Sequence, residues 1–152
     1  MSLKPDRVEA YTDISFFMNT TGTRGGIVVH DTSGSGVSMD DANAVVKYPT
    51  SGPSGTAPAG LLLNDVVNLD LTRQHINWHK DEVQVGSKVT ILRQGQVTTD
   101  VVATGLTITA GDSAYYTTSG LLTTSSTNSV KVGRFLSDYD ADGYVKVDIN
   151  IT

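Results

Sequence analysis

The sequence predicts an all-β protein, a small barrel or sandwich with a long irregular N-terminal arm. Only 38% of its 152 residues are hydrophobic, 15 are glycine, serine and threonine are abundant, and no stretch favours a helix. From residue 88 onward, short alternating apolar and polar runs are separated by turn signals. Residues 1–60 instead hold short apolar pieces between glycine-rich and proline-rich breaks, which is typical of an arm or long loops.

The final strand has the clearest pattern in the chain. Four apolar residues at every second position of "YVKVDINI" share one face of a predicted strand, and the polar residues between them share the other. The same period appears in "KVTI", near the start of the 88–152 region. We expect the buried core of this region to include Val89, Ile91, Val145, Val147 and Ile149.

Two hairpins are predicted before that strand. The segment "KVTILRQGQVTTDVV" alternates on both sides of Gln94-Gly95, which predicts a turn at that dipeptide. The segment "SAYYTTSGLLTT" repeats the plan around Ser119-Gly120.

The rest of the chain divides less clearly. Residues 61–87 predict a strand through Leu63, Val67 and Leu69, with a short helix as the alternative, followed by a polar connection anchored by Trp78. We therefore divide the chain into an arm with loops at 1–60 and a β-barrel domain at 61–152.

Composition and charge exclude several classes of protein. The net charge is −5 and no basic stripe is present, which argues against a nucleic-acid partner. The absence of cysteine removes disulfides and thiolate metal sites. No apolar run approaches the roughly 18 residues of a membrane span, and "MSLKPDRVEAY" lacks the core of a secretory signal, so we expect no membrane partner and synthesis in a cytoplasm.

The run "DYDADG" begins like a calcium-binding EF-hand loop, with Asp138, Asp140 and Asp142 followed by Gly143. Position 12 of such a loop carries a bidentate glutamate, but here it is Ile149, and both flanks predict strands rather than helices. An acidic turn, with glycine supplying a positive φ, explains the residues better. A weak cation site formed by the three aspartates is the alternative.

No catalytic motif is present, so we predict neither an enzyme nor a cofactor. There is no Gly-x-Ser-x-Gly elbow, and no glycine-rich segment matches a phosphate loop. His75 and His79 have the i, i+4 spacing of a zinc pair on a helix, but residue 76 is isoleucine where zincins carry glutamate. A polar or interface role suits these histidines better than metal binding.

Several residues are candidates for contact with a protein partner. Phe16 and Phe17, in "DISFFMN", are either an exposed anchor or part of the core. The remaining candidates are Arg24, His75, Trp78 and His79.

The last third of the chain resembles a known family. "AGDSAYYTTSGLLTT" followed by "KVGRFLSDYDADGYVKVDIN" is similar to the closing section of decoration (cement) proteins from tailed-bacteriophage heads. The shared elements are Ala110 to Asp112, Ser119-Gly120, Val132-Gly133 and Asp142 to Val147. The segment at 61–95 also resembles phage structural proteins, whereas residues 1–60 carry no pattern that we can match to the family.

The resemblance implies a small β-barrel or β-tulip on the outer surface of a virion capsid, without enzymatic activity. It also implies that the protein stabilises contacts between capsomers, with the major capsid protein as partner and a homotrimer as the expected assembly. The alternative is another phage structural module, either a tail or fibre component or a carbohydrate-binding β-sandwich. We expect residues 1–60 to provide much of the surface that contacts the capsid and neighbouring subunits.

Overall fold

The computed structural model describes residues 3–31, 45–50, 56–67, 82–83, 85–86 and 88–151. These residues form strands, turns and one short 3₁₀ turn, η1 (Thr118–Gly120), so the predicted all-β class is confirmed. In these ranges no helix has the length and apolar character needed to cross a membrane. The predicted residues Leu69, His75, Trp78 and His79 lie outside the described residues.

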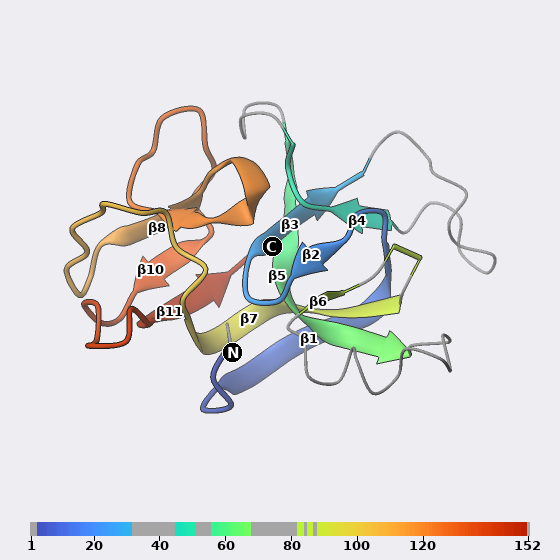
Figure 1. Cartoon of the computed structure of the whole chain (residues 1–152), viewed down its shortest axis with the longest axis horizontal. Coiled ribbons are helices and arrows are strands. Elements are labelled where there is room, and N and C mark those ends of the chain that lie inside the picture. Colours follow the sequence, from blue (N-terminus) through green and yellow to red (C-terminus); the bar gives the residue numbers. More distant parts are fainter. Residues whose placement is uncertain are drawn as a thin grey trace.

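The strands build one large sheet and one small sheet (Figure 1). The small sheet pairs β2 (Gly22–Thr23) with β6 (Glu82–Val83). The large sheet contains β1 (Val8–Met18), β3 (Ile27–His30), β4 (Val45–Lys47), β5 (Pro58–Val67), β7 (Lys88–Thr99), β8 (Ser113–Tyr116), β9 (Leu122–Thr123), β10 (Gly133–Phe135) and β11 (Val145–Asn150).

Five strands pair in a closed circuit, which we call the ring. β1 runs parallel to β4, and the pairs β4–β3, β3–β5, β5–β7 and β7–β1 are all antiparallel. The circuit closes because β7 uses both of its edges, one for β1 and the other for β5.

The other four strands, β11, β10, β8 and β9, extend the sheet from β7 and are called the wing. β5 pairs with the first half of β7, and β11 continues along the same edge with its second half. β10 then pairs with β11, β8 with β10, and β9 with β8. Figure 1 shows β8, β10 and β11 as a layer beside the ring strands, a sandwich-like arrangement.

Two hydrophobic cores stabilise this arrangement, and ring strands separate them. In β5, Leu61 and Leu63 pack into the large core under the wing, whereas Leu62 between them packs into the smaller ring core. β3 follows the same rule, with Ile27 and Val29 on one side and Val28 on the other. A strand with a core on each face reads as a continuous apolar run, because both sets of alternating side chains are buried.

The predicted core residues are all buried. Val89 and Ile91 lie in the ring core, and Val145, Val147 and Ile149 lie in the large core. The terminal strand that we predicted from period-two alternation is β11, and it keeps that alternation between buried and more exposed positions.

The predicted hairpin at Gln94-Gly95 is wrong, because β7 runs through this dipeptide as a single strand. Gly95 has a positive φ of 152°, and a side chain there would collide with the carbonyl oxygen of Val8 on β1. The glycine therefore permits a close approach of two strands rather than a chain reversal. The second predicted hairpin is confirmed: β8 and β9 pair across a turn in which Ser119 and Gly120 both have positive φ.

Residues 1–60 also differ from the loops that we expected. They supply β1, β3 and β4 to the ring, and the proposed division at residue 60 falls inside β5. Met18, Val28 and Val46 from this region are fully buried in the ring core. Short apolar pieces form strands here because partners that are distant in sequence supply their hydrogen bonds and packing.

Candidate functional site

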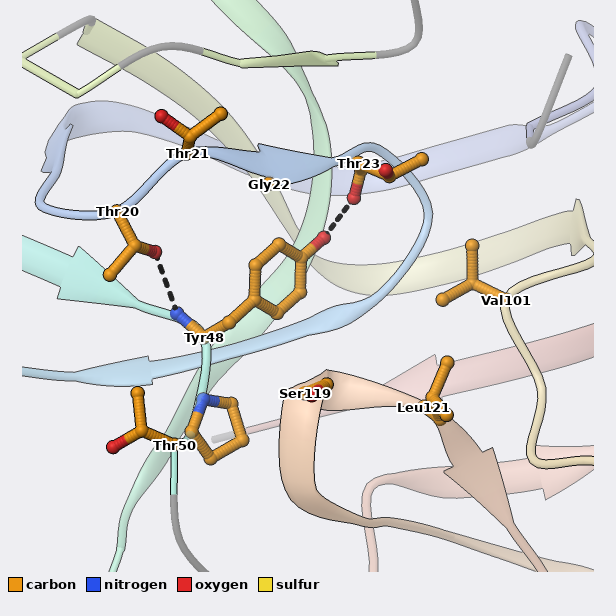
Figure 2. A pocket seen from close by; sticks show the side chains of 10 residues that line it. Thr20, Thr21, Gly22, Thr23, Tyr48, Thr50, Val101, Ser119 and Leu121 are labelled. Carbon is orange, nitrogen blue, oxygen red and sulfur yellow. Dashed lines mark hydrogen bonds between the residues drawn. The ribbon is translucent and has the colours of Figure 1, made fainter.

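A pocket of about 500 Å³ opens between the ring and the η1 turn of the wing. Figure 2 shows the threonines of the β1–β2 connection on one side of it, with Ser119 and Leu121 on the other. Its lining is uncharged and rich in hydroxyl groups: Thr20, Thr21, Gly22, Thr23, Tyr48, Pro49, Thr50, Val101, Ser119 and Leu121.

Tyr48 bonds to one side of this pocket, and its ring also lies close to the other. Its hydroxyl donates a hydrogen bond to the carbonyl of Thr23, and its backbone N–H donates to Oγ1 of Thr20 at 3.3 Å (Figure 2). Its ring lies so close to Gly22 and Gly120 that a side chain at either position would collide with it. Glycine at both positions therefore leaves the space that this ring occupies.

None of the described residues that line the pocket offers a group for acid–base catalysis near neutral pH. Burial of the hydroxyl raises the pKa of Tyr48 above its ordinary value, and a hydrogen bond with the Gly26 backbone offsets this only in part. The other lining side chains are aliphatic or neutral hydroxyls. A general acid or base needs a pKa near the working pH, so the chemistry of this pocket is that of contact and hydrogen bonding.

The aspartate run forms a turn in which the carboxylates of Asp138 and Asp140 accept hydrogen bonds. One Asp140 oxygen accepts hydrogen bonds from the N–H groups of Asp142 and Tyr144, both at 2.9 Å, and the other is 3.3 Å from Lys4 Nζ. Asp138 accepts a hydrogen bond from the N–H of Ala110 at 2.9 Å. These bonds fasten a reversal before β11, as an acidic turn requires.

The electrostatics of this turn agree with its geometry. The N–H of Tyr144, followed by that of Asp142 and by the ammonium of Lys4, holds the pKa of Asp140 below its usual value. Gly143 has the positive φ, 84°, that was expected of it. Among the described residues, no group of three or more histidines and carboxylates is arranged to hold a metal ion.

The structure places Phe16, Phe17 and Arg24 in or just after β1 and β2, all partly buried. Phe16 packs against the ring core and its ring centroid lies 5.5 Å from that of His30. The Nζ atom of Lys88 lies over the Phe17 ring, 5.4 Å from the centroid of that ring. The contact of these three residues with a partner remains a prediction.

Among the described residues, His30 is the one histidine, and it lies next to Phe16. Burial lowers its pKa below 6.5, and the positive charge of Arg93 lowers it further. The neutral imidazole is therefore the form that packs against Phe16 near neutral pH.

Sequence reasoning missed the exposed apolar side chains of β1. Val8, Tyr11 and Ile14 are 57%, 51% and 55% exposed, and with Val85 they are the most exposed large hydrophobic residues of the described part. Their spacing of three fits neither face of a regular strand, because bulges interrupt the β1–β7 register. Exposed apolar clusters on a soluble protein mark interaction surfaces more often than scattered single residues do.

Comparison with known proteins gives one family match. The family model described as "Structural cement protein (E217 gp24/Pam3 gp6)" matches residues 7–150, including the N-terminal region that carried no recognisable motif. No curated protein matches the chain significantly. Because the match spans nearly every strand of both the ring and the wing, the chain belongs to the family of phage structural cement proteins.

Proposed function

We propose that this protein binds the outer surface of a phage capsid and stabilises contacts between capsomers of the major capsid protein. The family match over residues 7–150 carries the proposal, because that family consists of structural cement proteins. The protein acts without catalysis, as a homotrimer assembled after synthesis in the host cytoplasm.

The fold supports such a role through its rigidity and its uncharged surface pocket. Two cores anchor the ring strands, so side chains projecting from them are held in place before a partner arrives. Preorganised contacts lose less conformational entropy on binding, and symmetric arrays multiply weak contacts by avidity.

We assign the capsid contact to residues 1–60, with the second half of β1 at its centre. Ile14 is 55% exposed, and Phe17 beside it is partly buried. A few residues usually account for most of the binding energy in a protein interface, and exposed apolar side chains are candidates for that role. Arg24, His75, Trp78 and His79 stay candidate contact residues.

Co-sedimentation with DNA-filled, tailless heads of the phage that encodes this chain tests the proposal. Wild-type protein should sediment with the heads, and Ile14→Ser with Phe17→Ser should weaken binding by about tenfold or more. Val130→Ser is the matched control, since Val130 is 46% exposed and belongs to the wing. Thermal melts of each variant separate loss of contact from loss of fold.

One result would contradict this function, and another would contradict only the assignment of the contact to β1. Wild-type protein that fails to bind heads but co-purifies with tails or fibres would favour the alternative structural role. Equal binding by the double variant and by Val130→Ser would remove β1 from the interface while leaving the capsid function intact.

A further inference from the structure

A second hollow, of about 350 Å³, lies where β1, β7 and β11 run side by side. One face of these strands is buried in the large core through Val97, Val147 and Ile149. The opposite face of the same strands surrounds the hollow, which we call the polar hollow. Its lining residues are Val8, Ala10, Gln94, Gly95, Gln96, Asp148, Ile149 and Asn150.

Strand register brings planar polar groups together around this hollow. Gln94 pairs with Asn150 and Gln96 pairs with Asp148 across β7 and β11. Paired residues on neighbouring strands project from the same face. Three amides and one carboxylate therefore form a compact group on a rigid support.

An aromatic ring borders the group. Tyr11 on β1 pairs with Gln94 at a point where bulges interrupt the register, and it is 51% exposed, outside the lining of the hollow. The Arg93 guanidinium lies 5.9 Å from the centroid of the Tyr11 ring. An accessible aromatic ring therefore lies on a strand that borders the hollow, without lining the hollow itself.

These polar side chains differ from most others on the surface. The carboxylates of Asp13, Asp138 and Asp140 accept hydrogen bonds from backbone N–H groups. Within the residues that the structure describes, the side chains of Gln94, Gln96, Asp148 and Asn150 make no hydrogen bond to another protein group. Their donors and acceptors are therefore free for a ligand.

The donor set selects the chemical class of that ligand. Each amide offers two N–H donors beside an oxygen acceptor, and a sugar hydroxyl both donates and accepts. One carboxylate beside three amides is a poor match for a divalent cation, which prefers several charged oxygens. An apolar ligand would strip water from four polar groups without replacing their hydrogen bonds.

We propose that the polar hollow is a binding site for an oligosaccharide. Gln94, Gln96, Asp148 and Asn150 bind its hydroxyl groups, and Tyr11 packs against the C–H face of a sugar ring. A volume of about 350 Å³ falls within the range of small-molecule sites. This activity is independent of capsid binding, and it gives a cement protein a second partner at the surface of a cell.

The full-length protein should be screened on an array of bacterial O-antigen, capsular and cell-wall oligosaccharides, followed by NMR titration with the strongest binder. We expect amide shifts confined to β1, β7 and β11. Gln94→Ala with Asn150→Ala, and separately Tyr11→Ala, should weaken binding by about tenfold. Tyr139→Ala is the matched control, because Tyr139 is an exposed tyrosine on the turn before β11 and lies outside the hollow.

Each outcome decides the proposal. Binding that is lost in the hollow variants and kept in Tyr139→Ala supports it, provided that melting temperatures and head co-sedimentation are unchanged. The absence of binding across the array, or an affinity that is unchanged in the hollow variants, overturns it. Variants that lose head binding instead would assign the hollow to the capsid contact, a result that leaves the proposed function standing.

Discussion

Residues 1–60 and 88–152 contribute to the same sheet, yet their sequences look different. β11 faces a core on one side and solvent on the other, so its buried and exposed residues alternate. β3 has a core on each side and shows a run of buried residues, whereas bulges in the β1–β7 pairing interrupt the alternation of β1. A segment that lacks periodicity can thus be as structural as one that shows it.

The largest effect is expected from removing residues 1–60, which tests whether they are part of the fold. A fragment containing residues 61–152 loses β1, β3 and β4, which opens the ring and exposes Leu62, Val89 and Ile91. We expect no cooperative thermal transition by circular dichroism and collapsed amide dispersion by NMR. A fragment that melts cooperatively would mean that residues 1–60 are an appended arm after all.

Paired leucine substitutions test whether β5 stabilises the core on each of its faces. Leu61→Ala leaves a cavity in the large core, and Leu62→Ala leaves one in the ring core. Each should lower the free energy of unfolding by about 2–5 kcal/mol in urea titrations. If Leu62→Ala costs less than about 1 kcal/mol, the ring core contributes little to stability.

Glycine substitutions test the junction between the regions. Gly120 and Gly111 both have positive φ, but a side chain at Gly120 would also strike Tyr48 and the carbonyl of Ile27, whereas Gly111 faces open space. We expect Gly111→Ala to cost about 1 kcal/mol and Gly120→Ala about 3 kcal/mol. Equal costs in denaturant titrations would show that the Tyr48 contact does not matter.

The smallest effect is expected from calcium. Because the Asp140 carboxylate is satisfied by Lys4 and two backbone N–H groups, millimolar calcium and excess EDTA should give melting temperatures within about 2 °C. A ligand at 100 times its dissociation constant would add about 2.7 kcal/mol, a shift of about 5–10 °C for a domain of this size. A shift of that size would establish the cation site.

The sequence predicts strands that have a core on one face only, and hairpins whose turn lies within a few residues. β11 and the hairpin around Ser119-Gly120 follow from alternation and turn chemistry. The error at Gly95 arose because a glycine that allows two strands to approach looks the same in sequence as a glycine that turns the chain. Ring closure depends on pairings between distant segments such as β1 and β7, which no local pattern specifies.

The candidate sites were harder to predict than the fold. Motif reasoning singled out residues with conspicuous chemistry, such as Asp140, which the structure uses to fasten a turn. The Tyr48 pocket is lined mainly by residues of connections and turns, and the polar hollow by glutamine and asparagine on separate strands. Only register reveals that Gln94 and Asn150 are neighbours, because 55 intervening residues separate them along the chain.

A density map of the assembled head is the most direct test of the proposed function. We expect this chain on the outer capsid surface, at junctions between capsomers, with the second half of β1 against the major capsid protein. Ile14 and Phe17 should lie in the contact, and the polar hollow should face away from the shell. Heads without density for this chain, or density confined to the tail or fibres, would contradict the account.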